Sequence, residues 1–172
     1  MVQSSANYFE LFKLPADFSL DLVDLKKRYL RLQSVVHPDK LAHRSELERR
    51  RALQQATLIN DAYQTLKSPL LRAKYLLEFK LGEVNWEQGG ELSMAFLTEQ
   101  IQWREAIAAA DSMAALEDLK ERVKQQCQQL ETELAQHFKV ANIVRESAIA
   151  TINQLQFMYK LLEEIQLRSD TA

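Results

Sequence analysis

Apolar residues recur at intervals of three and four along most of the chain, which is the period of amphipathic α-helices. One clear stripe lies in residues 22–36, and two longer stripes occupy residues 116–138 and 144–162. The pattern predicts an all-α protein. The stripes consist of Leu22, Leu25, Tyr29, Leu32 and Val36; of Leu116, Leu119, Val123, Cys127, Leu130, Leu134 and Phe138; and of Val144, Ala148, Ile152, Leu155, Tyr159 and Leu162.

Capping residues and prolines predict where the helices of the first half begin and end. Asp21 can cap the helix of residues 22–36, and Ser45 with Glu48 can form a capping box for the next one. Pro38 and Pro69 are expected to end these two helices. A short helix should precede them at residues 8–14, and a further helix should follow at 70–79. The inner face of the third helix is expected to consist of Leu53, Ala56, Ile59 or Asn60, Tyr63 and Leu66.

Glycine placement indicates a domain boundary. All three glycines fall within residues 82–90, whereas all three prolines precede this stretch. We therefore expect a domain at residues 1–80, a short packed connection at 81–91 and a second domain at 92–172. Long helices with short joints in the second half, the first of them at about 93–109, predict an antiparallel three-helix bundle.

Charge and cysteine content narrow the class of protein. The net charge is −2, but residues 1–80 sum to +5 and residues 81–172 to −7, so the two halves should meet different partners. Cys127 is the only cysteine, which excludes an internal disulfide, and its place in an apolar stripe predicts a buried side chain. No apolar run reaches the length of a membrane span, and the first residues do not form a signal peptide. The expectation is a monomeric cytoplasmic protein with no membrane contact.

The segment His37-Pro38-Asp39-Lys40 is the strongest candidate for a binding site. It follows a helix whose polar side carries four basic residues, which are Lys26, Lys27, Arg28 and Arg31. The Asp39 carboxylate suits an arginine of a partner, and the basic face suits an acidic patch that would steer the same partner.

The residues around this segment resemble a J-domain, the module of DnaJ-type co-chaperones. The similarity is carried by NYFELFKLP, by SVVHPDK and by INDAYQTLKSPLLRAKYLL, and it covers residues 7–79. The resemblance implies a helical hairpin whose HPD loop docks on an Hsp70-type chaperone and stimulates its ATPase. Its contacts would be His37, Pro38 and Asp39, supported by Lys26, Lys27, Arg28 and Arg31.

The order of the two domains makes the whole chain similar to the HscB family, the co-chaperones of iron–sulfur cluster assembly, in its bacterial form. AFLTEQIQWREAI and TINQLQFMYKLLEEI carry this second similarity. It implies that the C-terminal bundle binds the scaffold IscU and that the J-domain delivers it to the Hsp70 HscA. The implied scaffold contacts are Leu97, Thr98, Ile101, Glu105 and Phe157. Thr98 departs from the family, where a large apolar residue often follows the leucine.

Alternatives remain open at this point. The J-domain could serve another client, and the apolar residues Phe96, Leu97, Ile101 and Phe157 could be core. Phe157 lies off its stripe, with Leu161 one turn away, so an exposed patch is expected there. A small metal-dependent hydrolase would use His37, Asp39 and His43. The favoured reading is a protein with no active site, no metal and no cofactor. Nucleic acid is not expected as a partner, because the protein is acidic overall and the basic helix lacks interleaved aromatic residues.

Overall fold

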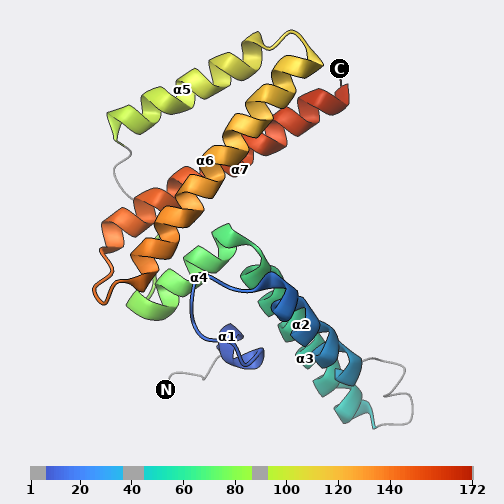
Figure 1. Ribbon diagram of the computed structural model, residues 1–172. Helices are drawn as coiled ribbons and strands as arrows, with labels where there is room; N and C mark the ends of the chain where they lie inside the picture. Colours follow the sequence, from blue (N-terminus) through green and yellow to red (C-terminus); the bar gives the residue numbers. More distant parts are fainter. Residues whose placement is uncertain (1–6, 37–44, 87–92, 172) are drawn as a thin grey trace. The chain divides into compact units, whose positions relative to one another are not determined.

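The computed structural model describes residues 7–36, 45–86 and 93–171, and all of their regular secondary structure is helical (Figure 1). This confirms the all-α prediction. No helix in these ranges combines the length and the apolar character needed to cross a bilayer. The helices are α1 (Tyr8–Leu11), α2 (Leu22–Val36), α3 (Glu46–Lys67), α4 (Pro69–Leu81), α5 (Met94–Ala109), α6 (Met113–Lys139) and α7 (Arg145–Thr171).

The chain divides into two compact units, Met1–Leu76 and Leu77–Ala172. Unit 1 contains α1, α2, α3 and most of α4, and both α1 and α2 pack on α3. Unit 2 contains the end of α4 and the helices α5, α6 and α7. The predicted domain limits at residues 80 and 92 stay a prediction.

Polar side chains cap the N-termini of α2 and α3, as the sequence predicts. Asp21 Oδ1 accepts hydrogen bonds from the backbone N–H of Val23, at 2.8 Å, and of Asp24, at 3.1 Å. The Ser45 side chain accepts from the Glu48 N–H, and a Glu48 carboxylate oxygen accepts from the Ser45 N–H at 3.0 Å. Each contact satisfies a donor that has no partner inside the helix, so the expected cap and capping box are both confirmed.

Arginine side chains satisfy the carbonyl groups at several helix ends. Arg72 donates to the Leu66 carbonyl in the last turn of α3, at 2.6 Å. Arg145, at the start of α7, donates to three carbonyls that follow one another at the end of α4 and just beyond it. Arg168, near the end of α7, donates to three carbonyls at the end of α5 and just beyond it. The acceptors of Arg145 are Leu81, Gly82 and Glu83, and those of Arg168 are Ile107, Ala108 and Ala110.

The core of unit 1 is rich in aromatic residues. Tyr8 and Tyr75 stack with ring centroids 4.5 Å apart, and the Tyr75 hydroxyl accepts from the Tyr8 N–H at 3.0 Å. This pair links α1 to α4. The fully or nearly fully buried apolar side chains are Phe9, Phe12, Phe18, Leu25, Ala52, Ile59, Ala62, Leu66, Ala73 and Leu76.

The inner face predicted for α3 is wrong at one residue, Leu53. Leu53 is 68% exposed, whereas Ala52 is 7% exposed and faces the core. Consecutive residues of a helix point about 100° apart, so Ala52 and Leu53 cannot both lie at the centre of a narrow buried face. The same rule decides the alternative left open at the next two turns, where Ile59 is buried and Asn60 is exposed.

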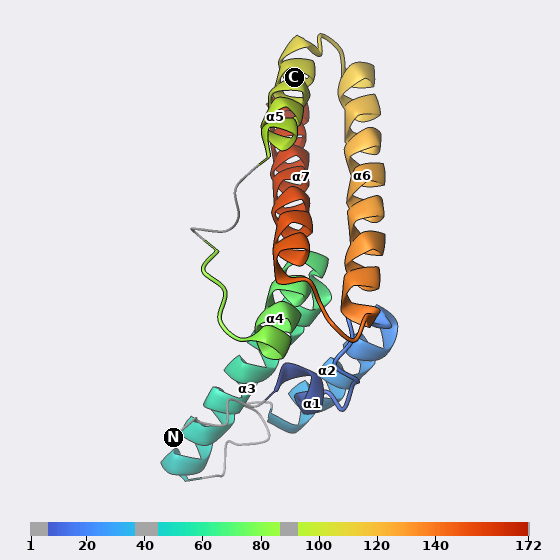
Figure 2. The same cartoon turned by 90° about the vertical axis from the view of Figure 1, so that its left-hand side faces the viewer.

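In unit 2, α5, α6 and α7 run alongside one another, as both views show (Figures 1 and 2). All seven positions of the α6 stripe are buried, as predicted. The α7 stripe is broader than the sequence pattern indicates, because α7 packs on both α5 and α6 and so buries two faces. Val144 precedes α7 and is 56% exposed, contrary to the expectation. The buried positions of α7 outside the predicted stripe are Thr151, Phe157, Met158, Leu161 and Ile165.

Candidate partner-binding surfaces

The predicted contact segment His37-Pro38-Asp39 lies outside the described residues, as do Lys40 and His43. Their assignments therefore stay predictions. The structure does describe the helix that leads to this segment and the helix that follows it. These two helices, α2 and α3, are packed against each other.

The basic face of α2 is defined by Lys26, Lys27 and Arg31, whose side chains are exposed. Within the described ranges, none of the three forms an ion pair. Unpaired exposed cations contribute little to folding stability, but together they create a positive potential that attracts an acidic partner. This face has the chemistry that the sequence predicted for docking.

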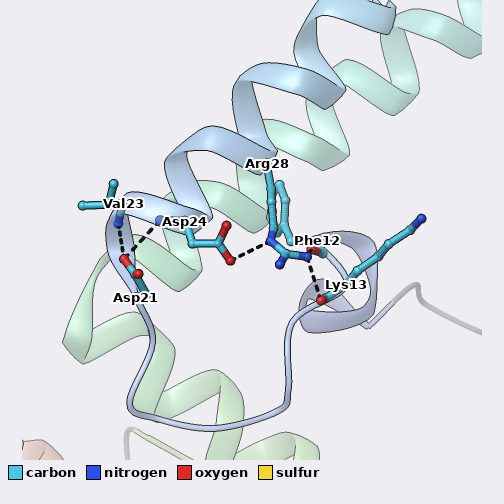
Figure 3. A network of polar contacts seen from close by, with 6 residues as sticks. All are labelled: Phe12, Lys13, Asp21, Val23, Asp24 and Arg28. Atoms are coloured by element: carbon cyan, nitrogen blue, oxygen red, sulfur yellow. Dashed lines mark hydrogen bonds and ion pairs between the residues drawn. The ribbon is translucent and has the colours of Figure 1, made fainter.

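Arg28, the fourth predicted contact on α2, is engaged within unit 1, and its contact with a partner stays a prediction (Figure 3). Its Nε donates to Asp24 Oδ2 at 2.8 Å, and its Nη1 donates to the carbonyls of Phe12 at 3.0 Å and Lys13 at 2.9 Å. Its side chain is 34% exposed. Lys13 adopts φ of +53°, a left-handed conformation that is uncommon for a residue with a side chain, at the point where the chain leaves α1. Arg28 thus ties the end of α1 to α2 and positions the basic face.

The predicted scaffold contacts of α5 lie on one exposed side of that helix. Leu97 is 36% exposed and Ile101 is 59% exposed, and Thr98 and Glu105 are also exposed. Residues three and four apart are neighbours on a helix surface, so these four side chains form a continuous strip. Sequence reasoning missed a further member, Met94, which is 77% exposed and lies three residues before Leu97. The spacing of Met94, Leu97 and Ile101 was the signal that could have found it.

Phe157 does not form the exposed patch that the sequence indicated. Its side chain is 6% exposed, and Leu161, one turn further, is 1% exposed. The Phe157 ring meets the edge of Phe96 with centroids 5.8 Å apart, and the Arg104 guanidinium lies 5.7 Å from its centroid. Phe157 lies off the stripe that faces α6 because it faces α5. A contribution of Phe157 to scaffold binding stays a prediction, and it would act by holding α5 in place.

One further contact between helices holds the rotation of α5, through Trp103, whose ring also has a hydrogen bond within α5. Trp103 Nε1 donates to Glu99 Oε1 at 3.3 Å, and the Arg122 guanidinium of α6 lies 5.2 Å from the Trp103 ring centroid. Phe96 and Ile107, at 5% and 1% exposure, anchor the two ends of the inner face. The side that carries Leu97 and Ile101 is thereby kept outward.

The described residues contain no group of three His, Cys, Asp or Glu side chains placed to hold a metal ion. Burial, reinforced by the Glu131 carboxylate, raises the pKa of the Cys127 thiol to about 11. The thiolate, which is the form that binds metals, is therefore strongly disfavoured at neutral pH. The side chain is buried in the α6 stripe, as predicted.

Comparison with known proteins shows the family. A family model described as "HSCB C-terminal oligomerisation domain" matches residues 92–166. The co-chaperone protein HscB homolog of Psychromonas ingrahamii is 40% identical, over 94% of this chain and 95% of its own length. That of Pseudoalteromonas atlantica is 37% identical, over 95% of this chain and 97% of its own length. The chain belongs to the HscB family of co-chaperones.

Solved structures of HscB proteins have the same fold. The chaperone HscB from Vibrio cholerae superposes with a TM-score of 0.84 at 39% identity, over 96% of this chain and 98% of that chain. The human co-chaperone protein HscB gives a TM-score of 0.90 at 29% identity, over 99% of this chain and 85% of that chain. This confirms the family resemblance and the arrangement of a J-domain followed by a C-terminal helical bundle. Membership of the HscB family supports the prediction that this chain is a J-type co-chaperone.

Replacing Arg28 tests its structural role. Arg28→Ala should lower the free energy of unfolding by about 1–2 kcal/mol, because two carbonyls and one carboxylate lose a shared charged donor at a half-exposed site. Arg28→Lys should recover little, because an ammonium group cannot bridge the three oxygens as the planar guanidinium does. Urea unfolding followed by circular dichroism measures this, with Lys27→Ala as the matched control. Equal stability of Arg28→Ala and Lys27→Ala would contradict the assignment.

Proposed function

We propose that this chain is an adaptor co-chaperone with no active site of its own, which binds the iron–sulfur scaffold IscU and delivers it to the Hsp70 HscA. The observation that carries the proposal is the exposed apolar strip on α5, in a chain whose family membership extends over both of its halves. A contiguous exposed apolar face on a helix that already buries its opposite face is typical of a partner-binding site. The activity is proposed to be cytoplasmic, and the predicted monomer stays a prediction.

The proposed contact with HscA uses the basic face of α2 and the HPD segment. The exposed cations Lys26, Lys27 and Arg31 would attract an acidic surface of the Hsp70 and increase the rate of encounter. Asp39 would then accept hydrogen bonds from an arginine of the chaperone, with His37 beside it. Arg28 would support this contact by holding α2, and its guanidinium is already shared among three oxygens of unit 1. The outcome would be faster ATP hydrolysis by HscA, with all chemistry performed in the partner.

The proposed contact with IscU uses the exposed strip of α5. Leu97 and Ile101 supply apolar area, and Glu105 supplies a carboxylate that has no hydrogen bond or ion pair within the described part of the chain. Thr98 lies between the apolar side chains, and its hydroxyl donates to the Met94 carbonyl at 2.9 Å. Its polar group is therefore satisfied within the helix, so Thr98 can be covered by a partner at little cost.

A matched pair of histidine variants tests the HscA contact. In a steady-state assay of HscA ATPase, wild type should stimulate hydrolysis, and His37→Gln should raise the half-maximal concentration at least about tenfold, as the loss of a central interface contact does. His43→Gln, a change of the same kind a few residues away, should behave as wild type. Equal stimulation by wild type and His37→Gln, or none by either, would refute the docking role.

Calorimetric titration with IscU tests the strip on α5. Leu97→Ala and Ile101→Ala should each weaken binding by about five- to thirtyfold, which corresponds to the loss of one buried aliphatic side chain. Leu167→Ala is the matched control, because Leu167 is a 68% exposed leucine on α7, away from the strip. Measurement at two temperatures avoids a binding enthalpy near zero. Absence of binding by wild type would remove the IscU role and leave a J-protein that serves another client.

A further inference from the structure

We infer that the scaffold-binding face of α5 begins one turn earlier than Leu97, at Met94, and that Met94 is its outer apolar anchor. The inference rests on the proposed function, and it adds a residue and a direction to that site. It starts from an imbalance in α5. The helix is apolar on the side that packs on α7 and again on the side that faces outward, whereas a surface helix usually has a polar outer side.

Exposure and spacing single out Met94. Its side chain is 77% exposed, the highest value among the large apolar residues of the described ranges. Met94, Leu97 and Ile101 follow each other at intervals of three and four, so the three side chains line one face of the helix. Met94 is also the first residue of α5, after the N-cap Ser93, and its flexible thioether side chain can adapt to an irregular partner surface.

The polar groups around this face are already satisfied. The Ser93 side chain accepts from the Phe96 N–H at 3.1 Å, and the Thr98 hydroxyl donates to the Met94 carbonyl. The first turn of α5 therefore has two of its polar groups paired locally. A partner that covers Met94 and Thr98 would therefore pay little free energy for desolvating polar groups. The burial of apolar surface would stabilise the complex.

Charge gives the face a direction. Glu105 lies on the same side of α5, about 16 Å from Met94 along the helix axis at 1.5 Å per residue. Arg104, which precedes Glu105 in the sequence, is directed to the Phe157 ring. The face thus runs from an apolar end at Met94 to an acidic end at Glu105. The surface of the partner that fits it is apolar, with a basic side chain at the end that meets Glu105.

Calorimetric titration of the full chain with IscU decides the question. Met94→Ala should weaken binding by about five- to tenfold, whereas Met94→Leu, which keeps most of the apolar area, should stay within about twofold of wild type. Met113→Ala is the matched control, because Met113 is a 55% exposed methionine at the start of α6. Met94 is exposed, so circular dichroism should show unchanged helix content in all variants.

The outcomes separate this inference from the proposed function. Weaker binding by Met94→Ala, together with wild-type affinity of Met113→Ala, supports the anchor. If Leu97→Ala and Ile101→Ala weaken binding while Met94→Ala binds as wild type, the face ends at Leu97 and the inference is wrong, although the proposed function stands. If wild type does not bind IscU, both are wrong.

Discussion

The attachment of α5 to α7 at two points is the constraint that determines which side of α5 is exposed. Near the start of α5, Phe96 packs edge-on against Phe157, and at its end Arg168 binds the last carbonyls. A helix held at one point could rotate about its axis, but a helix held at both ends cannot. The packing of the inward side of α5 therefore determines which side faces outward. Leu97 and Ile101 lie on that outward side and are exposed to solvent. Phe157 thus helps to determine which side of α5 is exposed, although its own side chain is buried.

Arginine has a second structural use that follows from the composition. With only three glycines in 172 residues, few helices can end in the glycine conformations that normally satisfy terminal carbonyls. Arg168 takes this role at the end of α5, where it binds three carbonyl oxygens. At the end of α4, Arg145 adds its donors to a glycine end, because Gly82 has a φ of +84° and donates to the Glu78 carbonyl. Arg28 binds two carbonyl oxygens just after α1. A basic residue on a polar helix face can thus belong to the architecture, and in α2 the cations free to meet a partner are Lys26, Lys27 and Arg31.

Helical periodicity was sufficient to predict the all-α fold and the complete buried stripe of α6, and the residue types at Asp21 and Ser45 were sufficient to predict the caps. Periodicity failed at α7, which buries side chains outside its predicted stripe. Phe157 packs against Phe96 of α5, so Phe157 and Leu161 belong to the core, although the sequence pattern indicated an exposed patch there. It also could not separate Ala52 from Leu53 or recognise Arg28 as structural, because the first depends on the rotation of α3 and the second on carbonyls fifteen and sixteen residues away in the sequence. The spacing of Met94, Leu97 and Ile101 was visible in the sequence, but the exposure of Met94 could be read only from the packed bundle.

The central claim is that α5 is the surface that recognises the client. Amide chemical-shift mapping of the isotope-labelled full chain upon addition of IscU tests it most directly, since every helix is observed at once. The account predicts that the largest changes follow the outward side of α5, at Met94, Leu97, Thr98, Ile101 and Glu105. A groove of about 530 Å³ between α6 and α7, lined by Lys120, Lys124, Leu162, Glu163, Gln166 and Leu167, should change little. Changes centred on that groove, with α5 unaffected, would contradict the account.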